Sequence, residues 1–419
     1  MFKVFWGGTL SLVKRGILYL LLPTVVSCAT YQGKLKKGRE LIQQGQPHQA
    51  AEAIKPFAEK ESDDQLVYLF DYGTALQIAG DYQESNKALL LADDLSEIQD
   101  YHSISRIGGS LLFNEGMVQY KGDDFEKVIV NAMLAINFLM MGQLDSALVE
   151  TRKINEKLYK YKFEGKLPYE QNEFAHYLAA MIWEADRKWD DAYIDYEKAY
   201  KLNPNIAYIK QDLIRAAYAS RRMEDYEKWK SKFTGVAESQ KWKDKKYGEL
   251  IVIYQQGWGP RKHPHPNAAS FPKLFPVKSY TTQANVVVDG SMEERTHFAY
   301  SVEKVAIKTL DDAYAGLIAK RLAAEATKQV VASQIDQKNK GWGQLAYLAM
   351  KITDRADLRQ WSTLPETFQV ARIPLKVGTH KVRVQGLNSH GASSGEEMES
   401  IDVTIRPGKK TFITWRSVQ

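Results

Sequence analysis

Cysteine is almost absent from this sequence, because its 419 residues include only Cys28. A single cysteine excludes an internal disulfide, so the fold depends on packing alone. The sequence also lacks CxxC motifs and Cys/His clusters, which excludes the usual structural zinc sites. It contains no nucleophile elbow, P-loop or HExxH motif, so we predict no catalytic residue, no cofactor and no metal.

Strong charge and a long apolar run are lacking as well. The formal net charge is +6, and Lys3, Lys14 and Arg15 supply three of those charges. The +3 that remains without them is too small to indicate nucleic-acid binding. The apolar run 16–26 has about 11 residues, whereas a helix that spans a bilayer needs roughly 20.

The sequence begins with the pattern of a signal peptide, in which basic residues precede the short apolar run and small residues follow it. Val25-Val26-Ser27-Cys28 resembles the bacterial lipobox, although that motif prefers leucine where Val25 stands. The resemblance implies that residues 1–27 are removed and that Cys28, the new first residue, carries diacylglycerol through a thioether. The alternatives are an uncleaved anchor and a plain secretion signal with a chance cysteine.

The residue after the cysteine bears on the expected location. Ala29, rather than aspartate, follows Cys28. By resemblance to enterobacterial lipoproteins, this favours the outer membrane, facing the periplasm. Three acyl chains, palmitate among them, would anchor the protein firmly, because each buried CH₂ contributes about 0.8 kcal/mol. Residues 28–33 are then a lipidated tether.

Residues 34–233 carry an internal helical repeat. The clearest copy is 174–205, and 72–94, 133–154 and a weaker 38–59 share its spacing. Its small, aromatic and proline positions are Ala180, Trp183, Trp189, Ala192, Tyr196, Ala199 and Pro204. Small residues let paired helices approach, and aromatic residues fill the gap between them. The spacing predicts an α-solenoid of tetratricopeptide-like helix pairs, whose concave face would bind a protein partner.

Residues 245–419 change to short apolar runs that are typical of strands. We predict strands over 249–257, 284–290, 298–310, 367–375, 379–387, 399–408 and 410–418, and helices over 311–335 and 343–357. The last four strands resemble a small β-sandwich. The expected fold class is therefore a multidomain α + β protein, with a solenoid followed by a mixed α/β domain that ends in β-sandwich-like strands.

Three polar features of the sequence are candidates for a site or a structural role. The proline-rich segment 258–266 is predicted to be a loop, and its Arg261, Lys262 and His263 suit an anionic ligand such as phosphate, a lipid headgroup or envelope glycan. A solvated or docked loop is the alternative. Asp124 is predicted to cap the following helix. Arg372 lies between apolar residues of a strand and is interpreted as an ion-pair partner at a strand edge.

The segments 121–131, 250–264 and 361–384 resemble a family of bacterial lipoproteins with tetratricopeptide-like repeats and no assigned function. The resemblance covers most of the mature chain. It implies an envelope protein that serves cell-wall or surface-structure assembly. We therefore expect a non-enzymatic, membrane-anchored scaffold that binds protein.

Two alternatives to the scaffold remain open. One is a periplasmic carrier or chaperone for a secreted polymer. The other is an enzyme acting on cell-wall glycan, which would need carboxylates or His/Ser side chains to converge near His263, His380 or Glu249.

Overall fold

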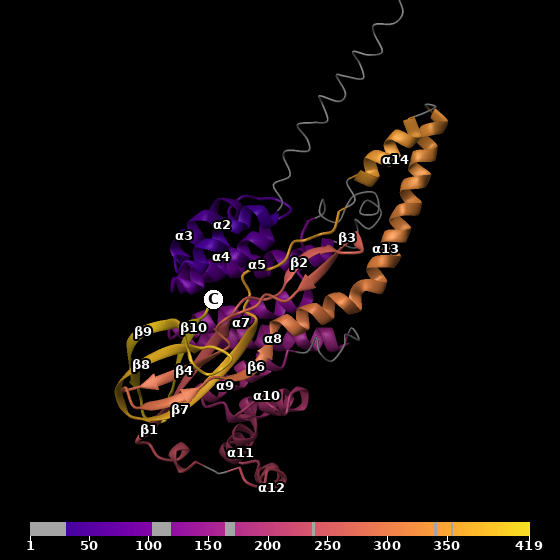
Figure 1. The fold of residues 1–419 in the computed structure, drawn as a ribbon. Coiled ribbons are helices and arrows are strands. Elements are labelled where there is room, and N and C mark those ends of the chain that lie inside the picture. Colours follow the sequence, from indigo (N-terminus) through magenta and orange to yellow (C-terminus); the bar gives the residue numbers. More distant parts are fainter. Residues whose placement is uncertain (1–30, 103–118, 164–171, 237–238, 339–341, 353–354) are drawn as a thin grey trace, which may run out of the picture.

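The computed structural model describes residues 31–419, except for 103–118, 164–171, 237–238, 339–341 and 353–354 (Figure 1). The described chain has a helical part, a strand-rich part and a long helical arm. The predicted signal peptide, lipobox and the first residues of the tether lie outside the described residues.

Antiparallel helix pairs build the first part. They are α2 (Tyr31–Gln43), α3 (Pro47–Ala58), α4 (Gln65–Ile78), α5 (Tyr82–His102), α7 (Asp124–Met140), α8 (Leu144–Phe163), α9 (Glu173–Ala185), α10 (Trp189–Leu202), α11 (Ile209–Ala219) and α12 (Met223–Lys232). A small residue is required where the two helices of the α4–α5 pair meet, because a Cβ at Gly73 would lie 2.6 Å from Leu89. The predicted helical repeat region is thus confirmed.

The start of α7 shows how the polar residues of a turn begin a helix. Asp123 is the N-cap residue and forms a capping box with Glu126, whose Oε2 accepts the Asp123 N–H at 2.9 Å. The prediction that Asp124 caps this helix is wrong by one residue, because Asp124 is already the first helical residue.

The strand-rich part contains two four-stranded sheets. The first has the order β10 (Lys410–Arg416), β1 (Tyr247–Gln256), β7 (Thr367–Lys376), β6 (His297–Ser301), and the second β5 (Met292–Arg295), β4 (Gln283–Val288), β8 (Gly378–Leu387), β9 (Ser393–Ile405). β10 is parallel to β1, and β7 is antiparallel to it. The four predicted strands of the tail therefore do not form the two sheets alone. β1 lies between β10 and β7, β4 pairs with β8, and both come earlier in the chain.

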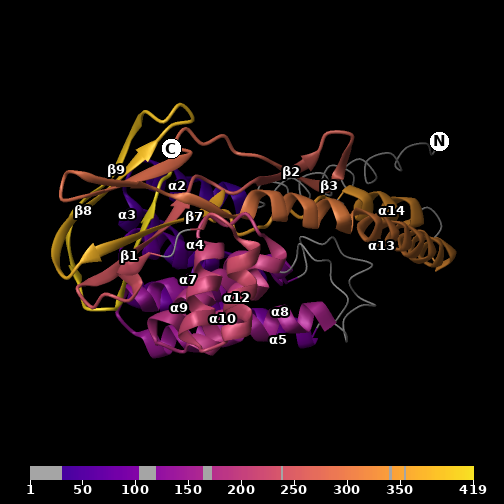
Figure 2. The same ribbon diagram turned by 90° about the horizontal axis from the view of Figure 1, so that it is seen from below.

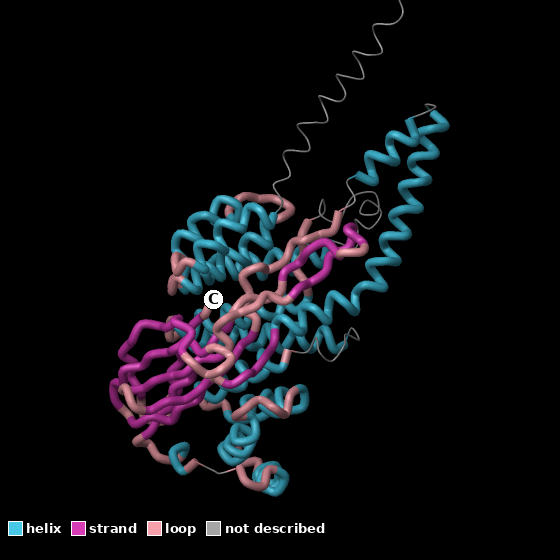
Figure 3. The backbone as a smooth tube through the Cα atoms, viewed as in Figure 1, coloured by secondary structure: helices cyan, strands magenta, loops and turns pink. Residues whose placement is uncertain are grey.

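Each face of the first sheet packs on a different layer. Val252 and Ile373 meet Val286 and Val384 of the second sheet in one apolar core. The opposite face, with Ile253 among others, belongs to the core of the helical repeats. Figure 2 shows the strands at one end of the molecule beside the repeats, and Figure 3 shows the same division by element type. The two parts consequently share one hydrophobic core.

Two predicted elements differ from the structure. The predicted loop 258–266 contains β2 (Arg261–His265), which pairs with β3 (Ala268–Phe275). The predicted strand 298–310 ends at Ser301, and α13 (Val302–Lys338) begins there. The Ser301 hydroxyl accepts the Lys304 N–H at 3.0 Å, which is N-capping geometry. α13 and α14 (Trp342–Ile352) form a long antiparallel arm that projects from the body (Figure 1).

Candidate binding cleft

The concave face of the repeats, which the sequence assigned to a partner, is contacted by the chain's own segment 360–372. Trp361 stacks on Phe70 of α4, with 4.4 Å between ring centroids and 5° between planes. The Trp361 indole N–H donates to Thr74 Oγ1 at 2.8 Å, and its backbone N–H donates to Glu126 Oε1 of α7 at 2.7 Å. Trp361 is 2% exposed, so it is packed between the repeats and the first sheet.

Two buried carboxyl groups of the repeats hold this segment. Asp71 of α4 accepts the Thr363 N–H and the Thr363 hydroxyl, each at 2.8 Å. Burial raises the pKa of Asp71 above its ordinary value, and hydrogen bonds oppose the rise. Burial also raises the pKa of Glu126 to about 7, with the nearby Asp123 carboxylate contributing. Both carboxyl groups therefore serve internal contacts.

Arg372 of β7 continues this attachment toward the end of the repeats. Its guanidinium contacts Asp212 of α11 at 2.6 Å, Glu249 of β1 at 2.8 Å and Glu184 of α9 at 3.3 Å. The predicted ion-pair role of Arg372 is thus confirmed. Its predicted place at a strand edge is wrong, because β7 lies between β1 and β6.

Two of the three carboxylates around Arg372, Glu184 and Glu249, have lowered pKa values, whereas burial raises the pKa of the third, Asp212. Burial alone would raise the pKa of Glu184, but Arg215, Lys410 and Arg372 outweigh it and lower the pKa to about 2. The same kind of cationic surroundings hold the pKa of Glu249 well below its ordinary range. A glycan hydrolase needs one protonated carboxyl group beside an ionised one, and the surrounding cations lower the pKa of both Glu184 and Glu249.

The other positions considered for catalysis have separate partners. His380 of β8 lies 2.7 Å from Asp289 at the surface, and His263 is exposed on β2. Across the described ranges, no group of three or more His, Cys, Asp or Glu side chains is arranged as a metal site.

The predicted anionic-ligand segment is largely taken up by internal contacts. Lys262 is buried, and its Nζ donates to Asp123 Oδ2 at 3.1 Å and to the Arg359 carbonyl at 3.0 Å. Arg261 donates to the Ser362 carbonyl, and burial lowers the pKa of Arg261 to about 10. Of the three predicted side chains, His263 is the exposed one. An anionic ligand here stays a prediction.

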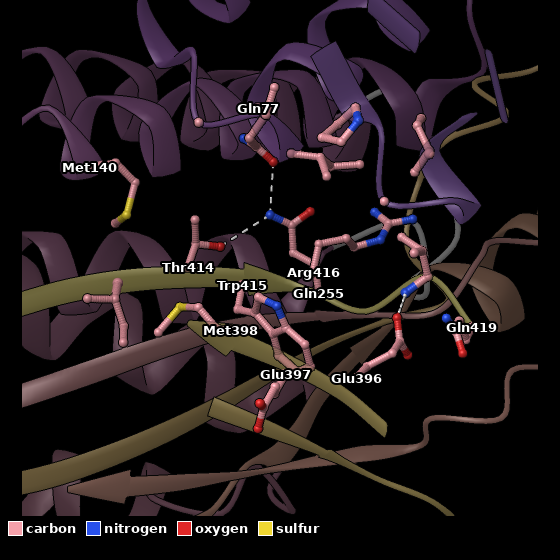
Figure 4. Close-up of a pocket in the computed structure, with 18 of the residues that line it drawn as sticks. Gln77, Met140, Gln255, Glu396, Glu397, Met398, Thr414, Trp415, Arg416 and Gln419 are labelled. Carbon is pink, nitrogen blue, oxygen red and sulfur yellow. Dashed lines mark hydrogen bonds between the residues drawn. The ribbon is translucent and has the colours of Figure 1, made fainter. Parts of the chain in front are cut away.

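An open cleft of about 930 Å³ lies between the helix turns of the first repeats and the strands β9 and β10 (Figure 4). Its half-buried apolar side chains are Ile78, Met140, Met398, Phe412, Trp415 and Val418. Its amide side chains are Gln43, Gln44, Gln77, Gln255 and Gln419. Glu396, Glu397 and Arg416 also line the cleft, so its wall combines apolar, amide and charged side chains.

Both sheets present an edge strand to this cleft. β9 and β10 are the last strands of their sheets, and residues 395–398 and 412–416 line the cleft. The Glu249 N–H donates to the Lys409 carbonyl, and the Ser417 N–H to the Gln255 carbonyl. Because the peptide groups of a strand alternate between its two sides, the amides of residues 412, 414 and 416 face away from β1. In the part of the chain that the structure describes, no second strand pairs with β10.

A polar bridge fixes the floor of the cleft to the repeats. Gln255 Nε2 donates to Gln77 Oε1 at 2.9 Å and to Thr414 Oγ1 at 3.3 Å, as the dashed lines in Figure 4 show. This bridge joins α4, β1 and β10, which are distant in sequence. Sequence reasoning found the strand 410–418 but could not find the cleft, because its walls meet only in the tertiary structure.

No family model and no curated protein matches the chain. Solved structures similar to part of it include MamA from Desulfovibrio magneticus RS-1, at 18% identity and a TM-score of 0.31 over 48% of this chain and 88% of that one. A tetratricopeptide repeat protein from Parabacteroides merdae ATCC 43184 has 14% identity and a TM-score of 0.33, over 48% of this chain and 64% of that one. At these values, neither likeness bears on what this chain binds.

Proposed function

We propose that this protein is a membrane-anchored scaffold of the bacterial envelope that binds an extended segment of a protein partner in the cleft. The observation that carries the proposal is the open edge of β10, which runs along a cleft of about 930 Å³ lined by both parts of the molecule. An extended peptide can add to such an edge as a further strand.

The cleft suits an extended peptide in three respects. The outward amides and carbonyls of β10 would supply main-chain hydrogen bonds, which do not depend on the peptide's sequence. Met140 and Met398 provide flexible apolar walls that fit different side chains. Gln77 and Gln255 add amide groups at the floor. Affinity would come from the backbone and selectivity from the side-chain pockets.

The concave groove is a weaker candidate for the same partner. A ligand there would have to displace Trp361 from Phe70 and separate Arg372 from its buried acids. Breaking one buried ion pair costs about 3 to 5 kcal/mol, which a peptide would have to recover. The cleft requires no such rearrangement.

The anchor and the location follow from the lipobox resemblance. Lipid on Cys28 would hold the described chain from the start of α2, because Tyr31 is only three residues later. The protein would face the periplasm from the outer membrane and hold a partner used in cell-wall or surface-structure assembly. No described helix is both long and apolar enough to cross a bilayer.

The peptide proposal can be tested with extended peptides selected from a random display library against the whole protein. We expect bound peptides to protect the Thr414 and Arg416 backbone amides from hydrogen exchange. Thr414→Pro should weaken binding at least about tenfold, because it removes an outward N–H from an edge strand that tolerates proline. Thr414→Val loses the same hydroxyl and keeps the N–H, so it should bind like the wild type. Peptides that leave both amides unprotected would refute strand addition.

A further inference from the structure

The α13–α14 arm exposes more large apolar side chains than a water-facing hairpin needs. On α13 these are Ile318, Leu322 and Val330, and on α14 they are Trp342, Leu345 and Leu348. Leu322 is 66% exposed and Trp342 58% exposed. Grouped exposed apolar residues of this kind mark a surface that contacts a protein or a membrane.

The exposed face of α13 is continuous along the helix. Ile318, Leu322, Ala326 and Val330 recur every four residues, so they lie along one side. Further exposed residues beside this row are Ala315, Ala319 and Ala323. α13 packs on the β2–β3 hairpin along a neighbouring side, where Tyr314 and Arg321 donate to carbonyls of β3. The outward face is therefore uncharged over about four turns.

The contact between the two arm helices combines the small residues Ala332 and Gly343 with polar groups. The Tyr347 hydroxyl donates to Glu325 across the contact, and the Gly343 N–H donates to Asp336 Oδ1 at 3.2 Å. Leu345 and Leu348, in contrast, are more than half exposed. Leucines on the outside suit an apolar environment around the arm.

The base of the arm adjoins the start of the described chain. Gln32 Nε2 of α2 donates to the Lys262 carbonyl of β2 at 2.6 Å and to the Leu358 carbonyl, after α14, at 3.3 Å. Figure 1 shows β2 and β3 lying between α2 and α13. Cys28 precedes Tyr31 by three residues, which span about 10 Å when extended. A lipid on Cys28 would hold the membrane near the base of the arm.

We propose that the α13–α14 arm lies in the surface of a lipid bilayer, with its exposed apolar side chains at the boundary between headgroups and acyl chains. The arm would be a second attachment beside the lipid, and would fix the orientation of the cleft relative to the membrane. A helix with a row of exposed apolar side chains can bind in the interface without spanning it. The choice of a bilayer as the occupant rests on the proposed anchor at Cys28.

The test uses the lipidated protein in vesicles that are an equal mixture of phosphatidylethanolamine and phosphatidylglycerol. Leu322→Cys and Leu345→Cys provide thiols for an environment-sensitive fluorophore, because the Cys28 thiol is blocked by its lipid. Glu227→Cys on α12, exposed and at the other end of the molecule, is the matched control (Figure 1). We expect nitroxide-bearing lipids to quench the two arm labels and iodide in the water to quench the control.

Two results would overturn the proposal. One is quenching of the arm labels by iodide alone, as at Glu227, which would leave the arm in water. The other is shielding of the arm labels from both quenchers together with a dimer in sedimentation, which would make a second copy the occupant. Unchanged circular dichroism and melting of each variant verify that the labelled proteins are folded.

The failure of the anchor and the failure of the arm can be told apart. The intact mass shows, before any fluorescence, whether Cys28 carries lipid. If it carries none, the variants are made with Cys28→Ser and vesicles are added to them. Leu322→Glu/Leu345→Glu should then lower vesicle binding at least about tenfold, because both changes place charge in the apolar boundary. Equal binding by this variant and its parent would overturn the arm proposal alone.

Discussion

Three acidic and three basic side chains meet where the repeats join the first sheet. They are Glu184, Asp212, Arg215, Glu249, Arg372 and Lys410, and they come from α9, α11, β1, β7 and β10. Equal numbers of opposite charges let the group be buried as a whole. Removing any one member would leave an uncompensated charge in a largely buried site.

Arg372→Met should destabilise the protein by about 3 to 5 kcal/mol, because Asp212 and Glu249 lose their central partner in a buried site. Urea unfolding measures the change. Arg383→Met is the matched control, because Arg383 is 45% exposed and pairs with Glu397 at 3.5 Å on the surface. That variant should lose less than about 1 kcal/mol. Equal losses for both would contradict the assigned role of Arg372.

The raised pKa of Glu126 predicts a pH dependence of stability. The folded-state pKa is about 7 and exceeds the ordinary value of 4.5, so the folded protein binds a proton that the unfolded chain has released between these values. The contribution of this group is thus fully present below the unfolded pKa and is lost as the pH rises through the folded pKa.

Glu126→Gln should remove this component. Between about pH 5 and pH 8, we expect the free energy of unfolding of the wild type to fall by roughly 2 to 4 kcal/mol more than that of the variant. Urea unfolding at a series of pH values provides the measurement. Parallel curves for the two proteins would show that Glu126 keeps an ordinary pKa.

Among the elements, segment 360–372 packs on the helices of the repeats that would otherwise be available to a partner. It contacts α4 and α7 through Trp361, α9 through Phe368, which stacks on Phe174 at 4.5 Å, and α11 through Arg372. Helices that would line a free groove are thereby buried on both sides. This arrangement leaves the edge of β10, rather than the groove, open to a partner.

Trp361→Ala should cost about 3 to 5 kcal/mol, because it removes the stacking on Phe70 and leaves a cavity in the core. Hydrogen exchange of the α4 amides and urea unfolding measure the effect together. Trp342→Ala is the control, since Trp342 is 58% exposed on the arm. That change should stay within about 0.5 kcal/mol. A Trp361 variant as stable as the control would mean that the segment is not docked in solution.

At the scale of the whole molecule, the proposed sites lie on different parts of one body. The cleft lies where β9 and β10 meet the first repeats, and the arm projects from the region of β2 and β3 (Figure 1). The core that the repeats share with the first sheet also includes Val302, at the start of α13. A membrane-bound protein of this shape would therefore present its cleft in a fixed orientation.

Cys28→Ala should abolish incorporation of labelled palmitate, because the thioether cannot form without the thiol. Labelling in growing cells followed by membrane fractionation measures this. Ser27→Ala is the control, since alanine also fits the small position before the cleavage site. The anchor proposal fails if the wild type takes up no palmitate and Cys28→Ala remains as firmly membrane-bound.

The helical repeats, most strands and the ion pairing of Arg372 can be predicted from the amino-acid sequence. These depend on local periodicity and residue size, which a linear chain displays. The start of α13 at Val302 was missed, because a short apolar run next to a serine fits a strand as well as a capped helix.

Which residues meet at the concave face of the repeats and in the cleft depends on the tertiary structure. Trp361 and Phe70, or Gln255 and Gln77, lie far apart in the chain and meet through folding. Their contacts depend on how the two parts pack, and periodicity carries no information on that packing. The sequence therefore specified the elements, whereas the shared core decided that the groove is closed and that the β10 edge is open.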